Sequence, residues 1–256
     1  MIAGLPMYDW PEVRSAMDGF WTDIAVGLAG AGLDVPSALT RDKPARELWQ
    51  DPDLILGQTC GLPFVSGLCG EAEVFARPDF GVDGADGGDY SSALVCRRGE
   101  ETSLANFHGR VAAINEYGSQ SGCNALADSV GTADFFSAVR VTGAHRDSAL
   151  AVARGDADIA AIDAVAWDLF KRFEAQAAIR LDVIGWTRTM PALPYIFGSG
   201  HTHRAALLRS AVSQACSGGP GLPKAIMPAT ADDYAPIRTM ARQLRGWRLA
   251  PMAPPL

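Results

Sequence analysis

A short polar turn, residues 119–122, is the segment of this sequence best suited to hold a small anion. Its members are Ser119, Gln120, Ser121 and Gly122. An apolar run typical of a strand, 111–114, precedes the turn, and a helical pattern, 123–130, follows it. A Ser/Gly turn at a helix start presents backbone N–H groups and hydroxyl donors beside the positive end of the helix dipole. The turn therefore predicts an anion site, with simple N-capping by Ser119 or Ser121 as the alternative.

Two titratable side chains stand at the ends of other apolar runs. His145 follows the run 139–142, where an imidazole can donate to a ligand oxygen; a capping or core histidine is the alternative. Asp163 follows the run 159–162, and ligands collect beyond the carboxyl ends of strands in open α/β sheets. Its carboxylate is suited to a ligand amine or hydroxyl, with capping of the helix that begins near Ala164 as the alternative.

Five further residues follow or precede strand-like runs and are candidates to line a binding site. They are Tyr8, Trp10, Gln58, Thr59 and Tyr90. The aromatic pair Tyr8 and Trp10 suits an apolar or quaternary-ammonium group. Ordinary loop packing is the alternative for each of the five.

Motifs for catalysis or metal binding are not found in the sequence. It contains no G-x-S-x-G elbow, no H-E-x-x-H and no P-loop lysine motif, and the pair His201 and His203 has the wrong partners for a metal. The five cysteines are scattered, which is neither a zinc signature nor a disulfide framework, although Cys60 and Cys69 could form one bridge. We therefore expect a non-catalytic binding protein with no cofactor and no metal ion.

Alternating periodicities indicate the elements that position these residues. Strands are expected at 2–5, 54–56, 93–96, 111–114, 139–142, 159–162, 181–184 and 193–197. Helices are expected around 17–24, 123–130, 146–154, 166–173, 208–215 and 237–244. Strands that alternate with helices predict the α/β class, with a mostly parallel sheet covered on both faces.

Two polar segments, 97–101 and 185–188, mark places where the chain passes between two lobes. We expect residues 1–97 and 188–256 to form a discontinuous first lobe and residues 98–187 to form the second. Ligands prefer the interface between such lobes, so a cleft that closes like a hinge is expected.

Composition limits the partners. Hydrophobic residues make up 48% of the chain and charged residues 20%, which is typical of a globular protein. The formal net charge is −7 and there is no Lys/Arg run, so nucleic-acid binding is not expected. The first residues show no basic n-region, long apolar region or Ala-x-Ala site, so no signal peptide is expected in this chain.

Seven segments in order resemble those of a known family. They are DLILGQTCGLP at 53–63, YSSALV at 90–95, LANFHGRVAAIN at 104–115, SQSGCNAL at 119–126, TGAH at 142–145 with Ser148, GDADIAAID at 155–163 and PALP at 191–194. Together they resemble the phosphate/phosphite/phosphonate substrate-binding proteins of ABC transporters, a branch of the type 2 periplasmic-binding fold. In this chain Gln120 replaces the small hydroxyl residue that phosphonate binders often carry.

The resemblance implies that Ser119, Gln120, Ser121 and His145 hold the anionic group of a small solute. It also implies that Asp163 lies in the pocket and that Tyr90 and the loop at Tyr8 close it. The implied partner is an ABC permease, the implied location is the periplasm, and a monomer is expected. The alternative is a cytoplasmic enzyme or sensor on the same fold, such as a dehydratase of the menaquinone pathway.

Overall fold

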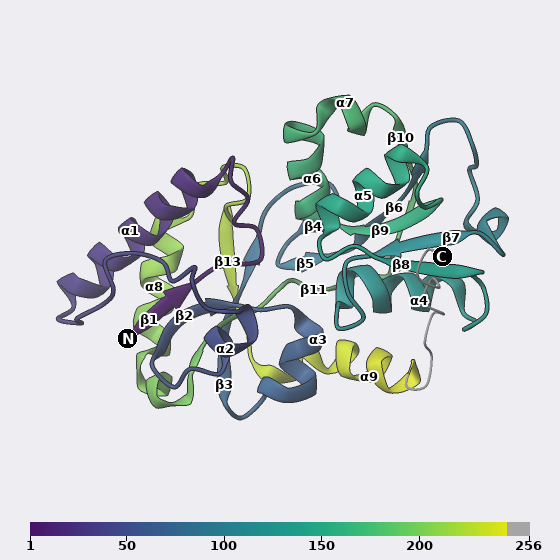
Figure 1. Ribbon diagram of the computed structural model, residues 1–256. Helices are drawn as coiled ribbons and strands as arrows, with labels where there is room; N and C mark the ends of the chain where they lie inside the picture. The colour runs from purple at the N-terminus through teal and green to yellow at the C-terminus, as the bar shows by residue number, and fades with distance from the viewer. Residues whose placement is uncertain (245–256) are drawn as a thin grey trace. The chain divides into compact units, whose positions relative to one another are not determined.

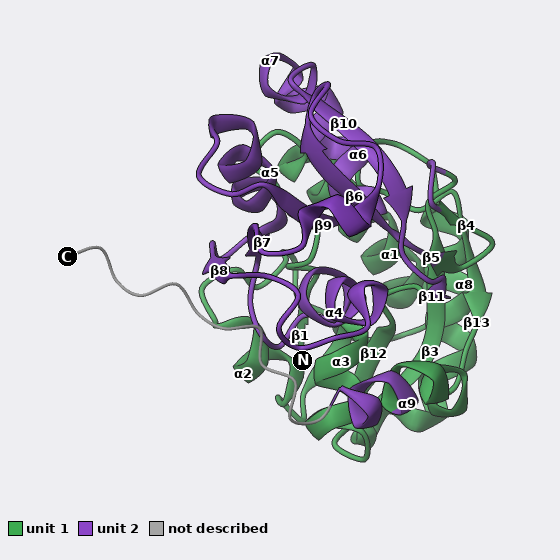
Figure 2. Cartoon of the chain, turned by 90° about the vertical axis from the view of Figure 1, so that its right-hand side faces the viewer, with its two compact units in different colours: residues 1–81, 85–89, 191–238 green, residues 82–84, 90–190, 239–256 purple. Residues whose placement is uncertain are grey.

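The computed structural model describes residues 1–244, which form two compact units (Figures 1 and 2). Unit 1 comprises residues 1–81, 85–89 and 191–238, and unit 2 comprises residues 82–84, 90–190 and the described residues from 239 on. Of the two lobe boundaries expected from the sequence, at residues 97 and 188, the first needs correction. Strand β6 (Ser92–Arg97) was expected in the first lobe, but it is hydrogen-bonded to β9 and β10 and therefore belongs to unit 2.

Unit 1 is built on a five-stranded sheet in the order β1-β2-β12-β3-β13. Its strands are β1 (Ile2–Gly4), β2 (Leu54–Gln58), β12 (Tyr195–Gly198), β3 (Ala72–Asp79) and β13 (Ala225–Pro228). Of the neighbouring strands in this sheet, β1 and β2 pair parallel, whereas β12 is antiparallel to β2 and β3, and β13 is antiparallel to β3.

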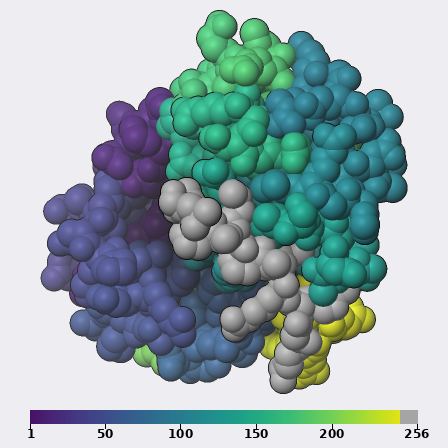
Figure 3. Space-filling view, turned by 45° about the vertical axis from the view of Figure 1, so that its right-hand side comes forward, coloured from purple at the N-terminus to yellow at the C-terminus, as the bar shows by residue number. Residues whose placement is uncertain are grey.

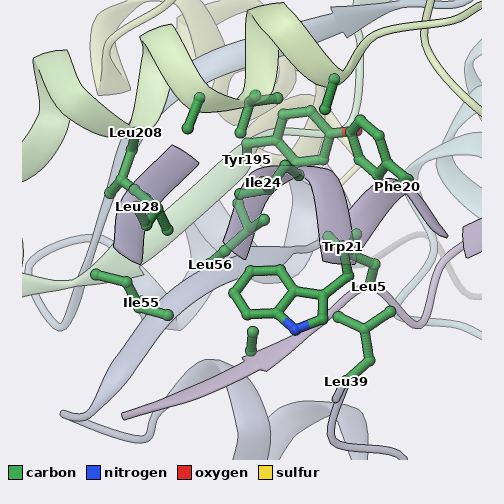
Figure 4. Close-up of a cluster of buried hydrophobic side chains, with 14 of the residues drawn as sticks. Leu5, Phe20, Trp21, Ile24, Leu28, Leu39, Ile55, Leu56, Tyr195 and Leu208 are labelled. Carbon is green, nitrogen blue, oxygen red and sulfur yellow. The ribbon is translucent and has the colours of Figure 1, made fainter. Parts of the chain in front are cut away.

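Helices α1 (Arg14–Gly30) and α8 (Ala205–Ala215) pack together and against this sheet. Helix α1 places Phe20, Trp21, Ile24 and Leu28 on one stripe, and all four side chains are buried. Figure 4 shows this stripe beside sheet residues such as Leu56 in the core of unit 1. The other helical segments of unit 1 are α2 (Ala45–Trp49), α3 (Gly61–Pro63), η1 (Phe64–Leu68), η4 (Ser199–Arg204), η5 (Ala231–Tyr234) and the first half of α9 (Ala235–Gln243).

Unit 2 is built on a second five-stranded sheet in the order β10-β6-β9-β7-β8. It combines β6 with β7 (Val111–Ile114), β8 (Ala138–Val141), β9 (Ile159–Asp163) and β10 (Leu181–Trp186). Strands β8, β7 and β9 are parallel, whereas β6 is antiparallel to both β9 and β10. The carboxyl ends of β7, β8 and β9 therefore share one edge of the sheet.

Helical segments pack on the sheet of unit 2. Segments η3 (Gln120–Asn124) and α4 (Ala125–Val130) contribute to the core that contains Leu94, Ile114 and Ile159. Helices α5 (His145–Arg154) and α6 (Ala164–Phe173) contact the strands β6 and β9, and α7 (Ala175–Ala178) packs on both helices. Segment η2 (Leu104–Phe107) adds Phe107 to the same core.

A small sheet, β11-β5-β4, is formed by the segments in which the chain passes between the units. Its strands are β4 (Ala85–Asp86), β5 (Asp89–Tyr90) and β11 (Met190–Pro191).

The strand directions in the sheets correct one expectation from the sequence. A mostly parallel arrangement was wrong, because β6, β10, β12, β3 and β13 all pair antiparallel.

Candidate functional site

The edge formed by the carboxyl ends of β7, β8 and β9 brings together the polar turn and His145. The turn 119–122 follows β7 and begins η3, and His145 begins α5 directly after β8. Segment η3 packs on β9, and α5 packs on β7 and β9, so both helix starts are held by the same sheet. Ligands of open α/β folds bind at such an edge.

Ser119 is the N-cap of the helical turn. Its backbone is extended, with φ −88° and ψ 130°, and its Oγ accepts a hydrogen bond from the N–H of Gly122 at 3.0 Å. The next residues, Gln120–Asn124, form a π-helical turn, a form frequent at functional sites. Capping is therefore one role of this turn, and Ser119 carries it.

Ser121 serves a different purpose from Ser119. Its Oγ lies 2.7 Å from Nε2 of His145, and only 3.4 Å from Oγ of Ser119. The Ser121–His145 hydrogen bond links the start of η3 to the start of α5. The sequence predicted both residues for the site but did not predict that they bind each other.

His145 is held as a neutral ring. Burial lowers its pKa to about 4, and the backbone carbonyl of Ala161 opposes this shift. Its Nδ1 is buried and has no hydrogen-bond partner of acceptable geometry among residues 1–244. At pH 7 the ring is thus an uncharged imidazole, in which one nitrogen can donate a hydrogen bond and the other can accept one.

The turn before His145 is stabilised by two hydroxyl groups. Oγ1 of Thr142 lies 3.1 and 3.0 Å from the carbonyl oxygens of Ile114 and Ala144, either of which can accept its one proton, and 2.7 Å from Oγ of Ser148. Ser148 is fully buried on α5. These contacts fix the connection between β8 and α5 and thereby the position of His145.

Gln120 is fully buried, and its side chain is turned toward other protein groups. Its Nε2 lies 3.0 Å from the sulfur of Met240, and its Oε1 accepts from Nδ2 of Asn124 at 3.3 Å. The amide group thus packs against Met240 and Asn124, and these contacts give it a structural role.

Gly122 allows a neighbouring side chain to approach. A Cβ at this position would collide with Oδ1 of Asn115, the residue that follows β7. Oδ1 of Asn115 is buried and lacks a hydrogen-bond partner within the described chain. Asn115 was not among the candidate site residues; its place directly after a strand, before the Ser/Gly turn, was the available signal.

Asp163 caps helix α6. Its Oδ1 accepts from the N–H groups of Val165 and Ala166, at 2.9 and 3.2 Å, and only 1% of the residue is exposed. Ser92 lies opposite Asp163 in the strand register, and its Oγ is a further buried polar atom without a partner in the described structure. Capping is therefore a demonstrated role of Asp163.

The remaining candidates belong to other segments of the chain. In unit 1, Tyr8 is buried and packs edge-on against Phe80 with ring centroids 5.1 Å apart, and the half-buried Trp10 donates its backbone N–H to the backbone carbonyl of Tyr8. Gln58 and Thr59 are buried at the end of β2; Nε2 of Gln58 has no partner in the described part of the chain. Tyr90 is buried in β5.

The structure describes no cluster for a metal and no disulfide. Residues 1–244 contain no group of three or more His, Cys, Asp or Glu side chains placed to hold a metal ion. Cys60 is buried, Cys69 is exposed, and both are free thiols. Within the same residues, no helix has the length and apolar character needed to cross a membrane.

Solved structures with the same fold come from several bacteria. A protein from Prochlorococcus marinus in complex with methylphosphonate matches with a TM-score of 0.76 at 15% identity, covering 96% of this chain and 98% of the other. A binding-protein component of an ABC phosphonate transporter from Pseudomonas aeruginosa matches at 0.71 and 15%, covering 96% and 86%. The aliphatic sulphonate binding protein of Escherichia coli matches at 0.63 and 12%, covering 98% and 88%. These likenesses confirm the α/β class and the type 2 periplasmic-binding fold.

The sequence itself matches a family model. No curated protein matches significantly. Residues 52–215, more than half of the chain, match the model described as "ABC transporter, phosphonate, periplasmic substrate-binding protein". That family consists of substrate-binding proteins of periplasmic importers, which work with a permease on a small solute. The chain belongs to this family of phosphonate-type substrate-binding proteins of ABC transporters.

Proposed function

We propose that the turn 119–122 and His145 hold the anionic group of a small phosphonate-like solute, which the protein carries to an ABC permease. The hydrogen bond between Ser121 and His145 carries this proposal. Because Ser119 already caps the turn, the hydroxyl of Ser121 is not needed for capping. Ser121 and His145 are then two polar groups brought together at a helix start, where an anion is stabilised.

The attraction in this proposal comes from neutral groups. Hydroxyl donors, the neutral ring of His145 and the positive end of the helix supply it without lysine or arginine. Each hydrogen bond to a charged oxygen contributes about 1.5–3 kcal/mol. Methylphosphonate is the first ligand to test, because a protein of the same fold was solved with it.

We further propose a partner and a location for the protein. A solute carrier of this kind works in the periplasm as a monomer that docks on its permease. The net charge of −7 gives no support to a role with nucleic acid. The buried capping role of Asp163 leaves its part in ligand binding as a proposal that depends on the family resemblance.

Calorimetric titration with methylphosphonate, phosphate, methanesulfonate and acetate tests the proposal. Ser121→Ala and His145→Ala should each weaken binding of the best ligand about tenfold to a hundredfold, since about 1.4 kcal/mol corresponds to a factor of ten. Ser129→Ala is the matched control, because Ser129 lies on α4 and, within residues 1–244, its hydroxyl donates to the carbonyl of Ala125 in its own helix. Unchanged affinity in both Ser121→Ala and His145→Ala would contradict the proposal.

A further inference from the structure

Unit 1 contains a polar cavity of about 150 Å³ that none of the site residues lines. Three cationic side chains, Arg14, Arg41 and Lys43, reach it, against one carboxylate, Asp9. Asp18 and Asp51, which pair with Arg41 and Lys43, are not part of the lining. The cavity has room for a small ion with part of its hydration, since a water molecule takes about 30 Å³.

The backbone near β1 shapes the cavity. The N–H of Thr40 donates to the carbonyl of Ala3 at 2.7 Å, which holds the segment after α1 against β1. Gly4 lies so close to the side chain of Leu48 that a Cβ would not fit there. In Figure 3 the purple and violet-blue atoms of the first part of the chain adjoin one another on the surface. The cavity is thus part of the folded unit.

Buried leucines form the apolar part of the lining. Leu5, Leu39 and Leu48 are each at most 7% exposed and line the cavity with Thr40. Apolar walls beside charged groups reduce the access of water and lower the local dielectric constant. An ion bound beside these walls interacts more strongly with the cations than it would in bulk water.

Arg41 is fixed in place by two carboxylates. Its Nε and one terminal nitrogen donate to the two oxygens of Asp9, at 2.5 and 3.0 Å, and the other terminal nitrogen donates to Asp18 at 2.7 Å. The hydrogen bond to Asp9 is the main reason that the pKa of Arg41 is raised. A guanidinium has five N–H donors, so two remain for a further acceptor.

Arg14 and Lys43 have spare donors. The ion-pair partner of Arg14 in the described chain is Asp9, at the long distance of 3.9 Å. Nζ of Lys43 donates to Asp51 at 2.7 Å, which uses one of its three N–H groups. Both side chains are about half exposed, with 51% and 41% of their surface accessible. They can turn toward an anion without breaking a buried contact.

Helix α1 adds a favourable dipole. It runs for 17 residues from Arg14, has no side-chain cap and has no acidic residue in its first turn. The N–H groups of its first turn therefore keep their partial positive charge beside the cavity. The helix start alone would not define a site; the cavity and the three cations define it.

We propose that this cavity binds a small tetrahedral oxyanion, such as phosphate or sulfate, independently of the turn 119–122. Arg14, Lys43 and the two spare donors of Arg41 contact the anion, and Asp9 holds Arg41 in position. The two sites lie in different units, so each can be removed without changing the residues of the other.

An NMR titration of ¹⁵N-labelled protein with inorganic phosphate tests this proposal residue by residue. The amides of Arg14, Ser15 and Arg41 should shift with a single saturable curve, and they should shift equally in Ser121→Ala. In the double variant Arg14→Gln with Lys43→Gln the affinity read from these amides should fall at least tenfold, because two charge-assisted contacts are lost.

The matched control is Arg172→Gln, which removes an exposed arginine of α6 that pairs with Asp168. This variant should bind phosphate at unit 1 like the wild type. Two results would overturn the proposal. One is an absence of saturable shifts at Arg14, Ser15 and Arg41, and the other is an unchanged affinity in the double variant. Melting temperature and amide dispersion confirm that each variant is folded.

Discussion

Helices η3 and α6 of unit 2 begin at the same edge of one sheet, and the first turn of each is stabilised in a different way. At α6 the carboxylate of Asp163 accepts from two N–H groups and is almost fully buried. At η3 the neutral hydroxyl of Ser119 accepts from one N–H group, and Ser121 is bound to His145. A helix start that already holds a carboxylate repels a second anion, whereas one capped by a hydroxyl still attracts it. We therefore propose that the first turn of α6 serves stability and that the first turn of η3 serves anion binding.

The largest effect in this comparison is expected at Asp163. Asp163→Ala leaves two buried N–H groups without an acceptor, so the free energy of unfolding should fall by about 2 kcal/mol. The matched change Ser119→Ala removes one neutral cap and should cost about 1 kcal/mol. Urea unfolding of both variants measures the two losses. Equal losses, or a greater loss in Ser119→Ala, would remove the distinction between the two turns.

The pH dependence of the free energy of unfolding tests the turn that contains Ser121, because its partner His145 is neutral in the folded state. Its pKa is about 4 there against 6.5 in the unfolded chain, so the unfolded state binds the proton first. The stabilising contribution is complete above pH 6.5 and is lost as the pH falls toward 4. Between pH 7 and pH 5 the wild type should lose up to about 2 kcal/mol more than His145→Gln.

Urea unfolding at several pH values checks this prediction. The carboxylates titrate alike in both proteins, so the difference between wild type and His145→Gln isolates the ring. Identical pH profiles would show that His145 is not held neutral. Because the ring is already uncharged at pH 7, removing His145 should not change how ligand affinity varies between pH 6.5 and 8.

The smallest effect is expected at Gln120, whose side chain packs against Met240 and Asn124. Gln120→Met should change the affinity for methylphosphonate by less than about threefold, because the amide that it removes contacts Met240 and Asn124. Calorimetric titration of Gln120→Met and of Ser121→Ala compares the ligand affinities of two variants in the same turn. A loss of affinity as large as that in Ser121→Ala would show that the Gln120 amide contacts the ligand.

Much of the fold was predictable because buried strands are continuous apolar runs. The run 111–114 coincides with β7, and 159–162 matches β9 apart from Asp163. Strand β3 was missed because Glu73, Arg77 and Pro78 interrupt its pattern, although it pairs on both sides. Strand β13 was missed because it is short and ends in a proline. In both cases the tertiary pairing outweighs the local pattern.

The sequence predicted where the candidate residues lie in the fold better than it predicted their contacts. It placed Ser121 and His145 at helix starts that follow strands and Asp163 at a strand end, and the structure has them at these positions. The orientation of Gln120 depends on Met240, which lies 120 residues away, so no local pattern reveals it. The low pKa of His145 depends on burial, which likewise appears only once the chain is folded.

A crystal structure of the methylphosphonate complex would show which groups hold the anion. We expect a phosphonate oxygen within hydrogen-bonding distance, about 2.7–3.2 Å, of Oγ of Ser121 or a side-chain nitrogen of His145. We also expect the N–H groups of Val165 and Ala166 to remain bonded to Asp163. A phosphonate group that contacts neither Ser121 nor His145, or that replaces Asp163 at the start of α6, would contradict the account.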